Sequence, residues 1–484
     1  MKTKTINVLN YHLLHTLSRG KLYIALFLAA CIIRLCVFIF FTHHNYRYCQ
    51  PDSNDYHLSA YALARTHSMY HPETKQPIFW RTPGYPLFLS LFYTLFPPPN
   101  STFMAAHQAH FYSLLTQIIA SSFIPIILFF LFLTLTQDYI LSRNGAWIFV
   151  FHPGYILSST YLLTESSAMI FLYGFYLCLY KSIGLSPRIR YFLYAGLLLG
   201  ITTWIRPMGQ FIIPAALLLI IVFGCYQKLN RWYAINIFLL SFALSVAPWY
   251  IRNYQLTHTW TFCPMIGTYL NAFSAPKILR AHTNIPLEQC WLHFQKKALS
   301  LLRKAKKTTP TPYILADKSC LQSALPIIIA HPFLFLKEWY LEVQKTCFDL
   351  YSAQYPALIN NTFWHDPLEE HLLSKTYACL VKEPLPWWMR ISAWLELIYA
   401  LWLWIHIIGA TITWLLIPYF FFKKNPETTA LLPYQSLWYK TVPLAFYLML
   451  MTGGFGYARL RLPVEPLLVL VALNYQKYRR RSFS

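Results

Sequence analysis

The sequence predicts an all-α polytopic membrane protein. Of its 484 residues, 56% are hydrophobic and only 12% are charged, whereas a soluble domain carries about 25% charged residues. Apolar runs of about 18 residues or more recur along the chain, and each is long enough to cross a hydrocarbon core of about 30 Å. Many Trp and Tyr residues stand at the ends of these runs, as they do in the aromatic belts of membrane interfaces.

The first membrane span is predicted at about residues 21–42, and the basic segment before it places the N-terminus in the cytoplasm. We expect this span to be retained, because it has no obvious small-residue cleavage site. The next loop, 43–106, is then external. Within it, 54–66 has the apolar spacing of a short amphipathic helix. The stretch 84–96 is apolar but too short to span, which favours a helix at the interface.

About ten spans are expected in total. Every short basic loop between them falls on the cytoplasmic side, as the positive-inside rule requires, and both termini are therefore cytoplasmic. The spans after the first are predicted at about 107–134, 144–162, 166–181, 191–205, 209–226, 233–250, 390–420, 441–454 and 462–476.

A long hydrophilic region, 253–388, is expected to be external and to precede the last three spans. It divides the chain into an N-terminal membrane module, 1–252, the external region itself, and the C-terminal spans with a basic cytoplasmic tail, 389–484. One long apolar-periodic stretch in this region, about 321–350, carries several charged side chains. It is therefore predicted to form a helix that lies on the outer membrane surface rather than one that spans the membrane.

The net charge of +23 does not indicate nucleic-acid binding. The basic residues lie in short loops, whereas a nucleic-acid interface gathers them on one surface. Such loops fit membrane lipids with anionic headgroups. The ten Cys residues show no zinc-type spacing, and the pairs His43–His44 and His107–His110 are too sparse to indicate a metal. No cofactor or metal is predicted, although the residues alone leave a divalent metal open.

The predicted topology leaves few acidic residues at outward-facing span ends, namely Asp52, Asp55 and Glu165. Ionisable groups at this depth are costly and usually serve a function. These acids therefore mark one external site near the membrane surface. The basic residues at the same level are Arg81, Arg206, Arg252, Arg459 and Arg461.

The chemistry of such a site follows from its residue types. Arginines at the headgroup level can bind a phosphate through planar, bidentate hydrogen bonds, so all five are candidate ligands of a donor phosphate. A carboxylate within reach can act as general base toward an acceptor hydroxyl or amine. Together these groups suit transfer from a lipid-linked phosphate to an external acceptor, because the arginines also stabilise the leaving phosphate.

Each of these residues also has a structural explanation. Asp52 precedes a predicted helix and is suited to cap it. Asp55 lies in the first turn, where an acid favours the helix dipole, and Glu165 stands at a corresponding position before the fourth span. Arginines such as Arg206 and Arg252 can extend to lipid headgroups without any catalytic role.

The acids and arginines stand in recognisable motifs. The first external loop contains Asp52-Ser-Asn-Asp55-Tyr56 and Arg81-Thr-Pro-Gly-Tyr85-Pro. Here the chain resembles the bacterial family-39-like glycosyltransferases, the protein-mannosyltransferase-like and aminoarabinose-transferase-like members of the GT-C superfamily. Further matches follow in the same order, at Leu163-Thr164-Glu165, at Gly196 and Gly200 with Arg206-Pro207, at Pro248-Trp249 with Arg252-Asn253, and at Tyr457-Ala-Arg459-Leu-Arg461-Leu-Pro463.

The resemblance implies a GT-C fold and assigns roles to individual residues. Asp52 would be the catalytic carboxylate, Arg81 would hold the lipid phosphate, and Glu165 would support the site or the acceptor as a second acid. The donor would be a polyprenyl-phosphate sugar, and the acceptor lipid A, another glycolipid, a glycan or a protein. The active site would face the periplasm from the bacterial inner membrane. Supporting roles in the same motifs fall to Asp55, Tyr56 and Tyr85.

Two other classes of function remain open at this point. A transporter or flippase of lipid-linked sugars would place charged residues at the middle of the membrane, next to paired discontinuous helices. A non-catalytic envelope assembly protein would depend on region 253–388 and would tolerate the loss of Asp52. The clustering of acids on one face favours the glycosyltransferase.

Overall fold

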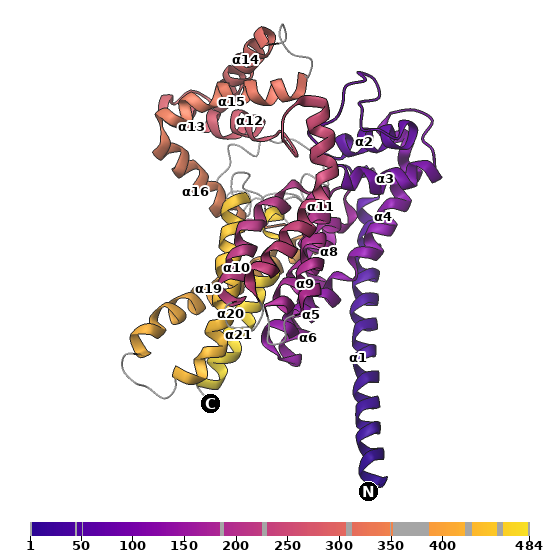
Figure 1. The fold of residues 1–484 in the computed structure, drawn as a ribbon, viewed down its shortest axis with the longest axis vertical. Helices are drawn as coiled ribbons and strands as arrows, with labels where there is room; N and C mark the ends of the chain where they lie inside the picture. The colour runs from indigo at the N-terminus through magenta and orange to yellow at the C-terminus, as the bar shows by residue number, and fades with distance from the viewer. Residues whose placement is uncertain are drawn as a thin grey trace.

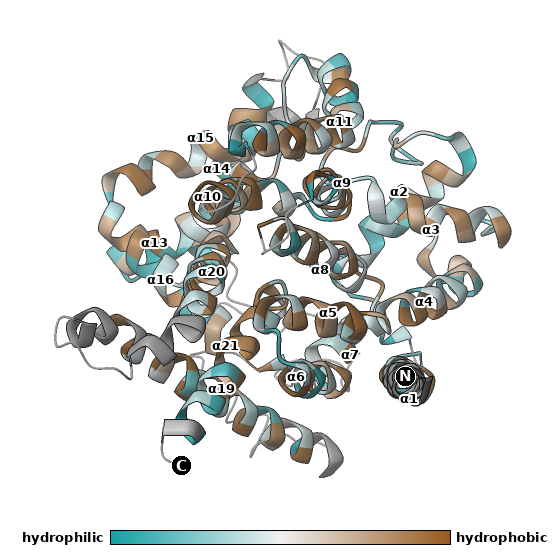
Figure 2. Cartoon of the chain, turned by 60° about the horizontal axis from the view of Figure 1, so that its bottom comes forward, coloured by the Kyte–Doolittle hydropathy of each residue, from teal (hydrophilic) through white to brown (hydrophobic). Residues whose placement is uncertain are grey.

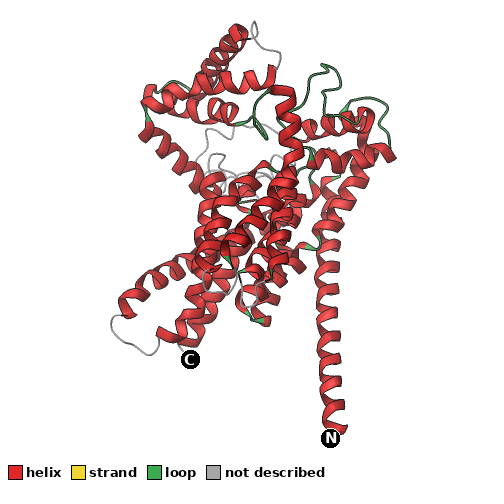
Figure 3. Ribbon diagram, viewed as in Figure 1, coloured by secondary structure: helices red, strands yellow, loops and turns green. Residues whose placement is uncertain are grey.

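The computed structural model describes residues 2–43, 46–50, 52–183, 188–224, 230–305, 312–348, 350–351, 387–421, 428–452 and 458–482. Throughout these residues the elements are helices joined by loops, and none of them forms a strand (Figures 1 and 3). The all-α class predicted from the sequence is therefore confirmed.

Several described helices are suited to cross a membrane. By length and composition four stretches qualify: Gly20–Thr42, Phe103–Thr136, Arg231–Thr257 and Arg390–Thr413. The chain is thus a multi-pass membrane protein. The other predicted spans coincide with further helices, among them α8 (Glu165–Ser182), α9 (Ile189–Ile205), η4 (Pro207–Ile212) with α10 (Ile213–Gly224), α20 (Thr428–Thr452) and α21 (Glu465–Ser482). The three longer elements are α1 (Lys2–Val37), which continues as η1 (Phe38–Thr42), α11 (Arg231–Thr257) and α19 (Trp387–Phe421).

Two predicted spans are interrupted by proline. The stretch predicted at 107–134 consists of η3 (Phe103–Ala106), α4 (His107–Ser121) and α5 (Ile124–Thr136), and Pro125 stands in the first turn of α5. The stretch predicted at 144–162 consists of α6 (Tyr139–Phe151) and α7 (Pro153–Thr160). His152 between them has extended dihedral angles, φ −67° and ψ 119°, because a residue before proline is disfavoured in the helical region.

The prediction of one continuous helix at 321–350 was wrong. The structure has α15 (Pro312–Ala330) and α16 (Pro332–Phe348) instead, bent by 107° at their junction. Pro332 explains the break, since it disfavours a helical His331 before it. The same region contains helices that periodicity did not indicate: α12 (Ile266–Tyr269), η5 (Leu270–Ser274), α13 (Ala275–Thr283) and α14 (Leu287–Ala305).

The centre of the bundle is formed by α8, α9 and α11. Gly200 of α9 lies directly against α11, where an added Cβ would be 1.7 Å from the hydroxyl oxygen of Ser245. Small residues permit such close approach between membrane helices. Figure 2 shows that the ribbons of α5, α8, α9 and α10 are predominantly hydrophobic.

One end of the bundle carries the predicted loop helices. α2 (Ser53–Thr66) and α3 (Gly84–Leu95) match the predictions at 54–66 and 84–96 to within one residue at each end. Helices α12 to α15 lie at the same end, whereas α1 begins and α21 ends at the opposite end (Figure 1). The last helix is preceded by η9 (Ala458–Arg461).

Candidate active site

The first charged group of the site joins the two motifs of the loop. Arg81 Nη2 donates to Asp52 Oδ1 and to Asp55 Oδ2, each at 2.8 Å, and Arg81 Nε donates to the same Asp55 oxygen at 3.1 Å. The side chain of Arg81 is 14% exposed, and that of Asp52 is 38% exposed. The guanidinium is thus enclosed, while the Asp52 carboxylate faces open space.

Asp52 does not cap the helix that it precedes. Its side chain makes no capping hydrogen bond to α2, because the carboxylate turns toward Arg81. Ser53 does not cap α2 either: its hydroxyl donates to Leu162 O at 2.9 Å and accepts from Gln50 N at 2.8 Å. These bonds tie the start of α2 to the chain segment that leads into Glu165.

The Arg81 turn is held against the end of α9. The Thr82 hydroxyl donates to Ile205 O at 2.9 Å. At Gly84 an added Cβ would lie 2.7 Å from the carbonyl carbon and oxygen of Trp204, so only glycine fits without a shift of the backbone. Arg81 is therefore fixed next to Arg206, the residue that follows Ile205.

Arg206 forms the second charged group of the site with Glu165. Nη1 of Arg206 lies 2.8 Å from Oε1 of Glu165, and their side chains are 18% and 5% exposed. Burial alone would lower the pKa of Arg206, but the charge of Glu165 outweighs this effect and raises that pKa. A buried pair of this kind is costly to break, because either partner alone would be an uncompensated charge.

Tyr56 lies between the two charged groups. The Arg81 guanidinium stacks over its ring at 4.9 Å. Burial raises the pKa of the Tyr56 hydroxyl, which also interacts electrostatically with Asp52, Glu165 and Arg206. The two groups consequently form one cluster of three carboxylates and two guanidiniums around a neutral phenol.

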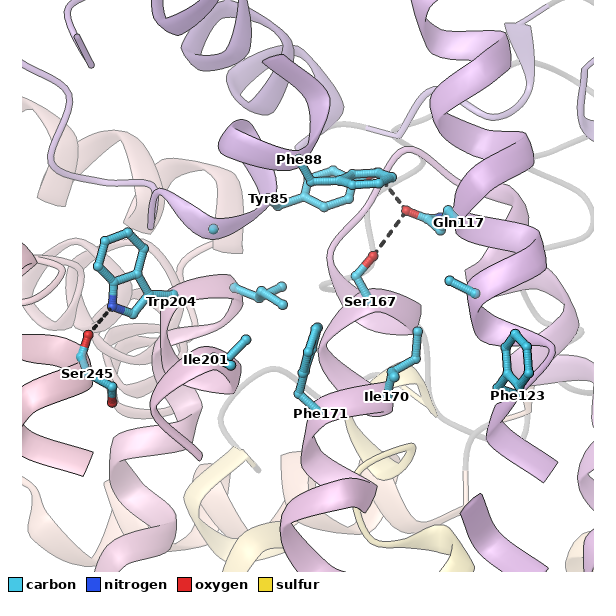
Figure 4. Close-up of a pocket in the computed structure, with 13 residues that line it drawn as sticks. Tyr85, Phe88, Gln117, Phe123, Ser167, Ile170, Phe171, Ile201, Trp204 and Ser245 are labelled. Carbon is cyan, nitrogen blue, oxygen red and sulfur yellow. Dashed lines mark hydrogen bonds between the residues drawn. The ribbon is translucent and has the colours of Figure 1, made fainter. Parts of the chain in front are cut away.

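An apolar cavity of about 620 Å³ adjoins this cluster. It begins at Gly84, three residues after Arg81, and at Ile205, the residue before Arg206. It continues between α3, α4, α8 and α9 (Figure 4). Tyr85 stands at one end, with its ring 5.3 Å from that of Tyr56. The cavity is lined by Gly84, Tyr85, Phe88, Gln117, Ala120, Phe123, Ser167, Ile170, Phe171, Ile201, Trp204, Ile205 and Ser245.

Gln117 is a site residue that the sequence analysis missed. Its Oε1 accepts from the Tyr85 hydroxyl at 2.9 Å, and its Nε2 donates to Ser159 O at 3.0 Å and to Tyr161 O at 2.8 Å. It thereby fixes the tyrosine at the end of the cavity (Figure 4). A lone amide within an apolar run was the available signal, because an amide inside the membrane needs partners.

The five candidate phosphate arginines are not all in one place. Arg252 donates to Met69 O and Ile78 O, both at 3.1 Å, and stacks over Trp249 at 4.5 Å, so it holds the chain segment before Arg81. Arg461 is buried elsewhere, where its Nη1 donates to Cys347 O at 2.6 Å. The Arg459 side chain lies outside the described residues. The arginines brought together at the cluster are Arg81 and Arg206.

Among the described residues, no group of three or more His, Cys, Asp or Glu side chains is arranged to hold a metal ion. His110 instead lies in a network of hydrogen bonds with tyrosines. Cys263 contacts the site: its thiol donates to Trp80 O at 3.3 Å, and burial raises the pKa of this thiol to about 12. It is therefore a neutral neighbour of the Arg81 turn.

The overall fold has a counterpart among solved structures. The chain is similar to the archaeal oligosaccharyltransferase AglB from Archaeoglobus fulgidus, solved in complex with an inhibitory peptide and a dolichol-phosphate, with a TM-score of 0.50 and 12% identity. The match covers 95% of this chain and 50% of AglB, so the chain spans half the length of that protein.

ArnT from Cupriavidus metallidurans gives weaker matches. They have a TM-score of 0.40 and 9% identity when it is bound to undecaprenyl phosphate, and 0.36 and 10% in the apo state. These matches cover 96% and 95% of this chain and 78% of ArnT. Neither protein-family models nor curated protein sequences give a match.

Proposed function

We propose that this chain is an integral-membrane glycosyltransferase that moves a sugar from a polyprenyl-phosphate donor to an acceptor on the periplasmic face of the bacterial inner membrane. The acceptor class is lipid A, another glycolipid, a glycan or a protein. One observation carries the proposal: the cluster of Asp52, Arg81, Glu165 and Arg206 adjoins the apolar cavity. Region 253–388 faces the periplasm in this proposal, between membrane parts 1–252 and 389–484.

The cavity is suited to part of a polyprenyl chain. Its volume of about 620 Å³ is within the usual range for small-molecule sites. Its lining is predominantly aliphatic and aromatic, and its few polar side chains, Gln117, Ser167 and Ser245, are hydrogen-bonded within the protein. An isoprenoid tail would thus bury apolar surface there without leaving polar groups unpaired.

The phosphate of such a lipid would lie at the level of Arg81 and Arg206. Arg81 uses Nε and Nη2 for the two aspartates, and no described residue accepts from its Nη1. That nitrogen is the natural first contact for a phosphate oxygen. As the sugar leaves, the guanidiniums would stabilise the charge that develops on the phosphate.

Asp52 would act as the general base. The acceptor hydroxyl gives its proton to the Asp52 carboxylate, its oxygen bonds to the anomeric carbon, and the bond from that carbon to the phosphate oxygen breaks, leaving its electron pair on the phosphate. A phosphate on Arg81 competes with Asp52 for Nη2, which frees the carboxylate for the acceptor. Asp55 keeps Arg81 oriented meanwhile, because it takes two donors from the guanidinium. Attack opposite the phosphate inverts the sugar carbon.

The test is transfer of a labelled sugar from polyprenyl phosphate by the full chain in nanodiscs that contain lipid A. Asp52→Asn is expected to insert and fold but to abolish transfer. Glu73→Gln is the matched control, since Glu73 is an exposed acid of the same loop. Full transfer by Asp52→Asn would rule out the mechanism, and donor counterflow without a covalent product would favour a flippase instead.

A further inference from the structure

Four buried side chains form a continuous chain of hydrogen bonds behind the charged cluster. The Tyr48 hydroxyl lies 3.4 Å from His110 Nδ1, His110 Nε2 lies 2.7 Å from the Tyr93 hydroxyl, and that hydroxyl lies 2.8 Å from His57 Nδ1. The chain ends where His57 Nε2 meets Ser101 O at 3.0 Å. All four side chains are at most 1% exposed.

The carbonyl of Ser101, at the end of this hydrogen-bond chain, determines where every proton in it lies. A carbonyl oxygen only accepts, so His57 Nε2 carries a hydrogen, and Nδ1 of a neutral His57 must accept from the Tyr93 hydroxyl. The Tyr93 oxygen then accepts from His110 Nε2–H, which leaves His110 Nδ1 to accept from the Tyr48 hydroxyl. With both imidazoles neutral, each bond has one donor and one acceptor. A proton added to either Nδ1 would place two hydrogens in one bond.

The hydrogen-bond chain connects the helices that set the geometry of the charged cluster. His57 is on α2, which follows Asp52 directly, and Tyr93 is on α3, which begins three residues after Arg81. His110 joins both to α4, and Tyr48 belongs to the segment that leads into α2. The Asp52–Arg81 contact of 2.8 Å therefore depends on how these bonds hold α2 against α3.

We propose that His57, Tyr93 and His110 are positioning residues for the transfer reaction, which hold Asp52 against Arg81 only while both imidazoles are neutral. The inference rests on the proposed function. The groups that face the two imidazoles are Tyr61 of α2, Tyr93 of α3, Phe103 of η3, Tyr48 of the preceding segment and, for His110, His107 of its own helix. No described carboxylate is among them, so an imidazolium there would lack a counter-charge.

Burial lowers the pKa of His57 to about 4, against an ordinary value near 6.5. The unfolded chain consequently binds a proton at His57 before the folded chain does. This contribution to stability is complete above about pH 6.5 and is lost as pH falls toward 4. Acid should therefore loosen the contact between α2 and α3 as well as slow the reaction.

The experiment compares His57→Gln and Tyr93→Phe with two controls at exposed positions, His293→Gln on α14 and Tyr112→Phe on α4. Each full-length variant in nanodiscs is assayed for kcat and donor KM from pH 4.5 to 8, and its thermal unfolding is followed over the same range. Tyr93→Phe should lower kcat by roughly ten- to a hundredfold, because small misplacements of reacting groups are costly. The amide of His57→Gln can donate and accept but does not titrate, so the acid limb of kcat should move to lower pH in this variant.

Wild-type kcat in folded Tyr93→Phe, or an unchanged acid limb in His57→Gln, would overturn the proposal. Should Tyr93→Phe fail to fold, the acid limb of His57→Gln decides. A wild type that transfers no sugar would instead refute the proposed function. The pH dependence of unfolding still tests the hydrogen-bond chain in that case, since the wild type should lose more stability on acidification than His57→Gln does.

Discussion

Gly84 packs directly against the backbone of Trp204. An ideal Cβ on Gly84 would lie 2.7 Å from the Trp204 carbonyl oxygen, and the neighbouring Thr82 hydroxyl donates to Ile205 O at 2.9 Å. This contact joins the loop that carries Arg81 to the helix end that carries Arg206. The two arginines of the site owe their proximity to it.

Gly84→Ala should separate those arginines. The obstacle is backbone rather than a flexible side chain, so the loop must shift, at a cost of about 1–3 kcal/mol in stability. We expect a lower thermal unfolding midpoint and a clear loss of transfer in nanodiscs. Gly20→Ala is the control, because an added Cβ there would meet nothing within 4 Å. Equal transfer by both variants would contradict this account of the turn.

Loss of the Asp55 carboxylate should reduce transfer less than loss of the Asp52 carboxylate. Its effect should pass through Arg81, which both aspartates contact. Asp55→Asn weakens the acceptor of two Arg81 donors, so the guanidinium is held less firmly while Asp52 remains. We expect kcat/KM to fall by about tenfold, against complete loss in Asp52→Asn. Arg81→Lys should be at least as severe, since an ammonium cannot present the same fork of donors. Identical loss in the two asparagine variants would mean that both aspartates are catalytic.

The sequence predicted α2 and α3 well, and it selected the acids of the cluster. Periodicity and turn residues are local, so they place Ser53–Thr66 and Gly84–Leu95 to within one residue. The sequence could not separate Arg206 from Arg252, because both are arginines at span ends that were predicted to face outward. What separates them is the group opposite each: the Glu165 carboxylate for Arg206, and the carbonyls of Met69 and Ile78 for Arg252.

Long-range contacts explain the remaining differences. Gln117 bonds to Tyr85 on one side and to the carbonyls of Ser159 and Tyr161 on the other. Nothing local to Gln117 indicates those partners, because they depend on how α3, α4 and α7 pack. The bend before α16 is the opposite case: Pro332 is a local signal, which the apolar periodicity of 321–350 obscured.

Glu165→Gln should destabilise the protein as well as inactivate it. It leaves Arg206 enclosed without its charged partner, and breaking a buried pair in this way costs about 3–5 kcal/mol. The double variant Glu165→Gln/Arg206→Gln removes both charges and should regain most of the thermal stability, yet remain inactive. Thermal unfolding in nanodiscs, paired with the transfer assay, measures both effects. Recovery of transfer in the double variant would exclude Arg206 as a phosphate ligand.

Filling the apolar cavity should weaken the binding of donors with a long isoprenoid chain more than the binding of short ones. Ile201 lines the cavity on α9, so Ile201→Trp places an indole where the isoprenoid tail is proposed to lie. We expect KM for a long polyprenyl-phosphate sugar to rise about tenfold, which corresponds to about 1.4 kcal/mol of binding. A donor with only two isoprene units should be affected much less, because it needs less of the cavity. Ile24→Trp, on the exposed face of α1, is the matched control. If both donors lose affinity equally, the indole acts through the charged cluster rather than by occupying the path of the tail.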